Sequence, residues 1–339
     1  MVSEHASAQG PGADVMSAVV GHSKAMQEVV TMIRQVAASS DTTVLLQGES
    51  GTGKDVVART IHALSSRAAH QFVDLNCAAI PETLLETELF GVESGAFTDA
   101  GPGREGYLVR ANKGTLFLDE IGSMPLMVQP KILRFLETRT FRPVGSTKEI
   151  RVDLRIISAT NLNLKAAVAH RTFREDLFYR LEVFTISLPP LRERLEDIEP
   201  LVTHFLQMNV AEGTAPLRMS AEAMTLLARY PWPGNVRELR SVIQYAQVLC
   251  DGGEVLPAHL PQHVLKAGCS GTERLHEVRQ QMSLPAEGID LAAFLSDIER
   301  KFIQEALNRC HGNQVQAAAL LGMSRDQMRY HLKKLRRPR

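Results

Sequence analysis

The sequence predicts an α/β protein: a parallel sheet with helices on both faces, followed by a small helical domain and a terminal helix-turn-helix domain. From residues 18 to 190, short apolar runs alternate with helical patterns, which is typical of a parallel sheet. A glycine-rich loop joins the first of these runs to a helix. From Leu191 to about residue 262 the pattern is helical, and two short helical segments separated by a glycine end the chain.

Composition limits the class of protein. The chain has 339 residues, which leaves room for two or three domains, and its hydrophobic fraction of 44% is ordinary for a soluble globular protein. The formal net charge is zero, so overall charge favours no partner. No apolar run has membrane-spanning length and the first residues lack a signal-peptide pattern, so we expect a cytoplasmic protein with no membrane contact. The four cysteines form no C-x-x-C pair.

Changes of pattern along the chain predict five segments. Residues 1–17 are small and polar and are expected to be a disordered tail. Residues 18–190 form the α/β domain and residues 191–262 the helical domain. Residues 263–288 show no sustained period and are interpreted as a linker. Residues 289–339 form the helix-turn-helix domain, which begins with a long amphipathic helix.

Four apolar runs are the clearest strands of the α/β domain. Helical patterns separate them, so neighbouring strands must be joined by crossovers and must run parallel. Their expected bounds are Thr43–Gln47, Phe72–Asn76, Thr115–Asp119 and Leu154–Ser158.

The loop after the first strand predicts a nucleotide site. Its sequence, GESGTGKD, fits the phosphate-loop pattern G-x-x-x-x-G-K, with an acid where Ser or Thr is usual. A strand precedes it and a helix follows, so glycine N–H groups can form an anion cradle at the helix N-terminus. The lysine can then reach the β- and γ-phosphates. The expected nucleotide-binding residues are Gly48, Glu49, Ser50, Gly51, Thr52, Gly53, Lys54 and Asp55.

Two acids end the third strand. Asp119 and Glu120 follow the apolar run Gly114–Leu118, and by themselves they are compatible with a solvated strand end. After a phosphate loop, the better interpretation is that Asp119 anchors Mg²⁺ and Glu120 polarises the attacking water. The sequence therefore predicts ATP and Mg²⁺ as cofactors.

The last segment is basic. From Arg325 to the end there are seven Lys or Arg residues against one acid. Ser324 is expected to cap a helix that follows a turn at Gly322, as in a DNA-recognition helix. The alternative is a solvated basic face. If the helix binds DNA, its first turn meets base edges through Arg325, Gln327 and Met328, and phosphates are contacted by Arg329, Lys333 and Lys334.

These motifs, in this order, resemble those of the bacterial enhancer-binding proteins. These proteins are AAA+ ATPases that activate transcription by the sigma-54 form of RNA polymerase. The resemblance covers roughly residues 18 to 336, and an acid at Asp55 is ordinary in the family. GAFTDA is similar to the family's GAFTGA loop, which contacts sigma-54; its residues are Gly95, Ala96, Phe97, Thr98, Asp99 and Ala100.

The resemblance also implies roles for five further residues. Asn76 matches the asparagine that switches the catalytic glutamate according to the γ-phosphate, and Asn161 matches sensor I. Arg174 and Arg180 match two arginine fingers that reach the neighbouring subunit's nucleotide. Arg237, in the run WPGNVREL, matches sensor II. From the residues alone, the two finger arginines would be surface ion pairs, and Asn76 would be a strand-end cap.

The resemblance implies three partners: the sigma-54 RNA polymerase holoenzyme, enhancer DNA and further copies of the chain, as a dimer on DNA and as a hexameric ring when active. Asp99 replaces a glycine of the family loop, which puts the strength of sigma-54 contact in question. The first 17 residues are too few to fold a sensory domain, so we expect control by expression or by a regulatory protein in trans.

Two rival functions stay open. One is a DNA-binding regulator of this fold that no longer engages sigma-54. The other is an AAA+ remodelling machine without a promoter role, against which the helix-turn-helix argues.

Overall fold

The computed structural model describes residues 16–93, 104–208, 217–250, 252–267, 300–307, 310, 313–320, 323 and 328. The chain divides into two compact units, residues 1–269 and residues 270–339. Several predicted features lie wholly or mostly outside the described residues. These are the tail at 1–17, the loop Gly95–Ala100, most of the linker and most of the helix-turn-helix domain.

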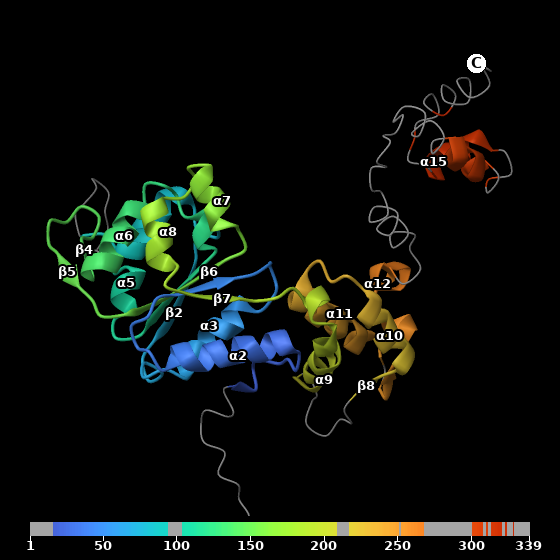
Figure 1. Cartoon of the computed structure of the whole chain (residues 1–339), viewed down its shortest axis with the longest axis horizontal. Helices are drawn as coiled ribbons and strands as arrows, with labels where there is room; N and C mark the ends of the chain where they lie inside the picture. Colours follow the sequence, from blue (N-terminus) through green and yellow to red (C-terminus); the bar gives the residue numbers. More distant parts are fainter. Residues whose placement is uncertain are drawn as a thin grey trace, which may run out of the picture. The chain divides into compact units, whose positions relative to one another are not determined.

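A five-stranded sheet forms the centre of the first unit (Figure 1). Its order is β2-β3-β6-β1-β7, and all neighbouring strands pair in parallel. The α/β prediction is confirmed, and four strands lie where the apolar runs place them. The bounds are β1 Val44–Gln47, β2 Phe72–Asn76, β3 Thr115–Asp119, β6 Arg155–Thr160 and β7 Phe184–Ser187.

Helices cover both faces of this sheet. Successive residues of a strand point to opposite faces, so one strand contributes side chains to a hydrophobic core on each side. In β3, Leu116 and Leu118 join one hydrophobic core, whereas Phe117 joins the other. The Phe117 face is covered by α2 Lys24–Ala37 and α3 Lys54–Ala63. The opposite face is covered by α4 Glu82–Phe90, α5 Tyr107–Arg110, α6 Gln129–Thr138, α7 Leu164–Ala169 and α8 Glu175–Leu181. A short hairpin, β4 Thr140–Phe141 and β5 Ile150–Arg151, follows α6.

A smaller helical domain, the lid, follows β7 and has its own core around the fully buried Trp232. The Trp232 indole N–H donates to the Leu227 carbonyl (2.9 Å), which satisfies its one polar atom. The lid contains α9 Ile198–Met208, α10 Ala221–Arg229, α11 Asn235–Leu249, α12 Gln262–Ala267 and the small pair β8 Arg218–Met219 and β9 Glu254–Val255.

The linker prediction is wrong at its start. Residues 263–267 belong to α12, and Val264 is fully buried in the lid core. The run is too short to show a clear helical period, which is why the sequence pattern did not reveal it.

The second unit is described in part. Residues 300–307 are helical and α15 spans Gln314–Leu320. Ile303, Ala306, Ala317 and Ala318 form a buried cluster, and Met328 is fully buried in it. The prediction that Met328 meets base edges is therefore wrong, because a side chain that holds the helix against its neighbours is not free to contact DNA. Among the residues that the structure describes, no helix is long and apolar enough to cross a membrane.

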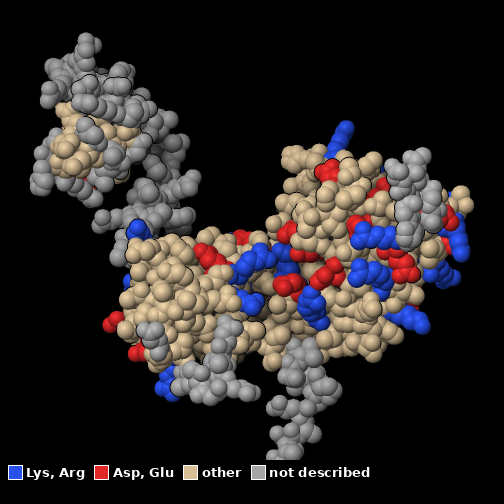
Figure 2. All heavy atoms as spheres, turned by 180° about the vertical axis from the view of Figure 1, so that it is seen from behind, with Lys and Arg blue, Asp and Glu red and all other residues tan. Residues whose placement is uncertain are grey.

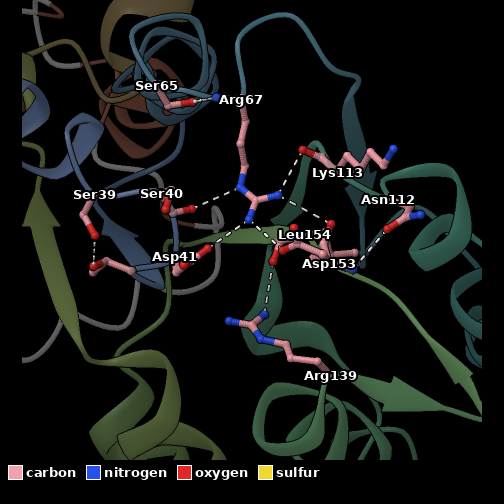
Figure 3. Close-up of polar contacts among 11 residues, drawn as sticks. Ser39, Ser40, Asp41, Ser65, Arg67, Asn112, Lys113, Arg139, Asp153 and Leu154 are labelled. Carbon is pink, nitrogen blue, oxygen red and sulfur yellow. Dashed lines mark hydrogen bonds and ion pairs between the residues drawn. The ribbon is translucent and has the colours of Figure 1, made fainter.

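One polar cluster joins the amino ends of three strands (Figure 3). Arg67 donates to the carboxylates of Asp41 (2.9 Å) and Asp153 (2.7 Å) and to the backbone carbonyls of Ser40 and Lys113. The segments that it joins lead into β1, β3 and β6. Arg67 thus fixes the end of the sheet opposite the phosphate loop.

Candidate nucleotide-binding site

A cavity of about 280 Å³ lies at the carboxyl edge of the sheet, beside the lid. Parallel strands present their carboxyl ends at one edge, so the loop after β1 and the acids at the end of β3 meet there. Figure 2 shows Lys, Arg, Asp and Glu side chains gathered around a hollow on one face of the molecule. The cavity is lined by Ser50, Gly51, Gly53, Lys54, Asp55, Val56, Asp119, Glu120, Phe205, Val236, Arg237 and Arg240.

The phosphate loop has the backbone that an anion cradle requires. Gly51 and Gly53 have φ of 80° and 102°, in the left-handed region that glycine enters without strain. Lys54 begins α3, is 6% exposed and donates to the carbonyls of Gly48 (2.9 Å) and Glu49 (3.1 Å). Burial lowers the pKa of Lys54, while the nearby carboxylates of Glu120 and Asp119 act in the opposite direction. Its ammonium therefore rests on carbonyls that phosphate oxygens can replace.

The two acids after β3 are held differently from each other. Asp119 accepts from the Glu120 backbone N–H (3.0 Å) and from the Asn76 side-chain amide (3.3 Å). Glu120 accepts from the Asn161 backbone N–H at 3.4 Å. Glu120 also has φ of 51°, an uncommon backbone angle for a residue that is not glycine.

Asn76 thus contacts Asp119 and not Glu120 in this structure. Asn76 and Asp119 are register partners in the neighbouring strands β2 and β3. The Asn76 carbonyl oxygen accepts from the backbone N–H groups of Ala78 (2.9 Å) and Ala79 (3.1 Å), as a strand-end cap does. Asn161 lies beside a neighbouring cavity of about 370 Å³ that also contacts the phosphate loop.

The lid contributes Arg237 to the nucleotide cavity. Its backbone N–H donates to the Gly51 carbonyl (3.2 Å), and its guanidinium donates to the Ser50 hydroxyl (3.0 Å). The start of α11 is fixed by Glu238, which accepts from the Gly234 backbone N–H (2.8 Å) and the Tyr230 hydroxyl (2.9 Å).

Sequence reasoning missed three residues that contact the phosphate loop. Arg192 makes two hydrogen bonds to the Glu49 carboxylate (2.6 and 2.8 Å), and the Asn235 amide donates to Glu49 (3.2 Å) and to the Ser50 carbonyl (3.0 Å). Arg192 first, and then Asn235, lower the pKa of Glu49 to about 2. Arg194, 3% exposed, donates to the Thr52 carbonyl at 3.1 Å. The only sequence signal was the position of Asn235 directly after the Pro-Gly break.

Arg174 and Arg180 are absent from the residues that line the nucleotide cavity. Arg174 pairs with Asp176 through two hydrogen bonds (3.0 and 2.6 Å), and Arg180 donates to the Leu136 carbonyl (3.2 Å). Within one chain, both arginines are therefore held by their own surroundings, away from Lys54 and Glu120.

A parallel five-stranded sheet, a phosphate loop, paired acids and a helical lid that carries an arginine define an AAA+ ATPase. Family comparison agrees: residues 19–187 match the sigma-54 interaction domain, residues 192–276 the AAA+ ATPase lid domain, and residues 294–335 the Fis family of bacterial regulatory proteins. The chain belongs to the family of sigma-54-dependent transcriptional activators.

Individual relatives share most of this chain. It is 44% identical to the regulatory protein AtoC of Escherichia coli over 315 residues, which are 93% of this chain and 67% of AtoC. It is 45% identical to the uric acid sigma-54-dependent transcriptional regulator UacR of Escherichia coli, described as putative, and spans about half (53%) of that protein. The crystal structure of NtrX from Brucella abortus in complex with ADP has a TM-score of 0.67 and 34% identity, covering 96% of this chain and 72% of NtrX.

Proposed function

We propose that this chain binds enhancer DNA and uses ATP hydrolysis to remodel the closed promoter complex of sigma-54 RNA polymerase. The observation that carries the ATPase part is the cavity that brings together Lys54, Asp119, Glu120 and Arg237. NtrX, a relative of this chain, has crystal structures in complex with ADP and with ATP, which supports nucleotide binding by this chain. The family assignment supports the sigma-54 and DNA parts.

In the proposed mechanism, Glu120 orients and deprotonates the attacking water, and Lys54 and Arg237 stabilise the charge on the phosphates. The donor set fits Mg²⁺, because this ion is commonly held by one or two carboxylates together with substrate phosphates. Asp119 would hold the ion, which would neutralise developing charge on the β- and γ-oxygens. Asn76 touches Asp119 directly, so it is placed to respond to changes at that carboxylate.

The proposed active form is a hexameric ring with a nucleotide between subunits. Arg174 and Arg180 would then stabilise charge on the neighbour's γ-phosphate. This agrees with their absence from the cavity of their own chain. The test mixes Arg180→Ala subunits, which keep Lys54, with Lys54→Ala subunits, which keep Arg180. Some turnover should return in the mixture, whereas full activity of a monomer at high dilution would rule out arginines acting in trans.

The sigma-54 part is tested by capture of sigma-54 in the presence of an ATP transition-state analogue. The wild-type chain should retain sigma-54, and Thr98→Ala should lose both capture and promoter opening while ATP hydrolysis persists. Asp99→Gly should preserve or raise promoter opening at an unchanged rate of hydrolysis. Promoter opening that survives Thr98→Ala would favour the rival, a DNA-binding regulator of this fold that does not engage sigma-54.

The DNA part assigns enhancer binding to residues 289–339, as a dimer on a palindromic site. Ser324 would cap the recognition helix, Arg325 and Gln327 would lie at base edges, and Arg329, Lys333 and Lys334 on phosphates. Removal of residues 289–339 should abolish the enhancer footprint and leave ATP hydrolysis intact. A truncated chain that still protects the enhancer would contradict this assignment.

A further inference from the structure

The lid holds the phosphate loop at four consecutive residues. Glu49 is bound by Arg192 and Asn235, Ser50 by Asn235 and Arg237, Gly51 by the Arg237 backbone and Thr52 by Arg194. The approach is close: a Cβ added to Gly51 would lie 2.3 Å from the Gly234 carbonyl oxygen. Loop and lid therefore meet backbone to backbone at the nucleotide cavity.

Asn235 is the centre of this contact. It is fully buried and has φ of 52°, a left-handed angle that asparagine tolerates better than most residues. Its side-chain oxygen accepts from the Leu191 backbone N–H (2.8 Å), and its amide nitrogen makes the two bonds to the phosphate loop. One side chain thus ties three segments together: the start of the lid, the start of α11 and the loop.

Arg192 strengthens the same connection from a second lid segment. Its guanidinium binds both oxygens of Glu49 in a parallel fork, which fixes direction as well as distance. Because Arg237 lies two residues after Asn235 in the first turn of α11, anything that fixes Asn235 also fixes where Arg237 can reach.

We propose that Asn235, Glu49 and Arg192 form a clamp that positions Arg237 for the nucleotide, with Asn235 and Arg192 as positioning residues that touch no substrate themselves. This inference rests on the proposed role of Arg237. If the clamp acts through Arg237, substitutions in the clamp should lower nucleotide affinity when Arg237 is present and should have little effect on affinity when Arg237 is removed.

The experiment measures affinity for a fluorescent, slowly hydrolysed ATP analogue. Asn235→Asp keeps the shape and the acceptor for Leu191 but replaces the two donated bonds by a second carboxylate beside Glu49, and affinity should fall about tenfold or more. Arg192→Gln removes a half-exposed ion pair, so a loss of about two- to fivefold is expected. Arg134→Gln, which removes a similarly exposed pair with Glu149, should change nothing.

The deciding step repeats both clamp substitutions in an Arg237→Ala background. There, Asn235→Asp and Arg192→Gln should have almost no further effect on affinity. An equal factor of lost affinity in both backgrounds would overturn the positioning role.

Thermal unfolding of each variant shows whether the protein still folds. If Asn235→Asp does not fold, the substitution of the exposed Arg192, Arg192→Gln, decides the question alone. If Lys54→Ala still binds the analogue normally, the proposed nucleotide site fails; if Lys54→Ala loses binding but Asn235→Asp does not, only the clamp fails.

Discussion

Two clusters of cations and carboxylates lie at opposite ends of the same sheet, and they use similar residues in different ways. At the amino ends of the strands, all three guanidinium nitrogens of Arg67 donate to carbonyls or to Asp41 and Asp153. At the carboxyl ends, Lys54 donates only to two loop carbonyls, and Arg237 donates to a loop hydroxyl.

This difference separates a structural cluster from a candidate functional one. The partners of Arg67 belong to segments that the sheet itself holds in place, so no ligand is needed to complete them. Lys54 donates to backbone carbonyls of the phosphate loop and the Arg237 guanidinium to its Ser50 hydroxyl, and phosphate oxygens can take the place of these acceptors. The comparison predicts that substitutions at the amino end, around Arg67, alter the free energy of unfolding. Substitutions at the carboxyl end, around Lys54 and Arg237, should alter nucleotide binding and hydrolysis.

The largest effect is expected at the carboxyl end, for Glu120→Gln. Loss of the general base should lower kcat by about 10²–10⁴-fold, while nucleotide binding stays nearly intact. Binding should persist because the Glu120 carboxylate accepts a single, long hydrogen bond in the described part of the chain, from the Asn161 N–H (3.4 Å). Steady-state hydrolysis and analogue binding are the measurements. Normal turnover of ATP by Glu120→Gln would show that the base is another residue.

The next effect concerns the close approach of loop and lid. Gly51→Ala places a Cβ 2.3 Å from the Gly234 carbonyl oxygen, at a φ of 80° that alanine avoids. Overpacking of this kind costs about 1–3 kcal/mol, so we expect KM for ATP to rise about 30-fold. Gly252→Ala is the matched control, because its φ is 121° but a Cβ there meets nothing within 4 Å. An equal rise of KM in both variants would assign the effect to backbone strain and not to the close approach of Gly51 to Gly234.

At the amino end, Arg67→Met should lower the free energy of unfolding by about 1–2 kcal/mol, because the Ser40 and Lys113 carbonyls lose a charged donor. The Arg67 side chain is 10% exposed, so water replaces these bonds poorly. Denaturant unfolding measures the loss. Nucleotide affinity should not change, and a parallel loss of affinity would remove the distinction between the two ends.

The fold was largely predictable because its central strands are continuous apolar runs. β1, β2, β3 and β6 were all identified in this way. β7, Phe184–Ser187, was not, because it is a four-residue edge strand with only Ile186 fully buried. The hairpin β4 and β5 has two residues in each strand, too few to show an alternation.

The site was predictable only where its residues are close in sequence. Lys54, Asp119 and Glu120 belong to short motifs at strand ends. The clamp residues were missed because Arg192 and Asn235 are 143 and 186 positions from Glu49, and nothing local in the chain indicates such a contact. Met328 was misplaced for a related reason: the side of a helix that meets the core depends on partners such as Ile303, which lie in another helix.

The smallest expected effect is a difference in how the free energy of unfolding depends on acid pH. It can sharpen the comparison of the two ends of the sheet because each cluster holds a carboxyl with a depressed pKa. Arg67 lowers the pKa of Asp41, and Arg192 lowers the pKa of Glu49 from 4.5 to about 2. A carboxyl whose pKa is lowered on folding stabilises the folded state fully above its ordinary pKa, and this contribution is lost as the pH falls through the folded value. For Glu49 the window therefore runs from pH 4.5 down to about 2.

Glu49 and Arg192 are nearly half exposed, so solvent screening keeps the contribution small. Arg192→Gln should flatten the acid dependence of unfolding slightly within this window and leave stability at neutral pH almost unchanged. Arg67→Met should lower stability at neutral pH as well, since it also removes the bonds to backbone carbonyls, which do not titrate. The measurement is urea unfolding of the three proteins over a pH series. Identical curves for wild type and Arg192→Gln would mean that the ion pair does not hold the lid to the loop in solution.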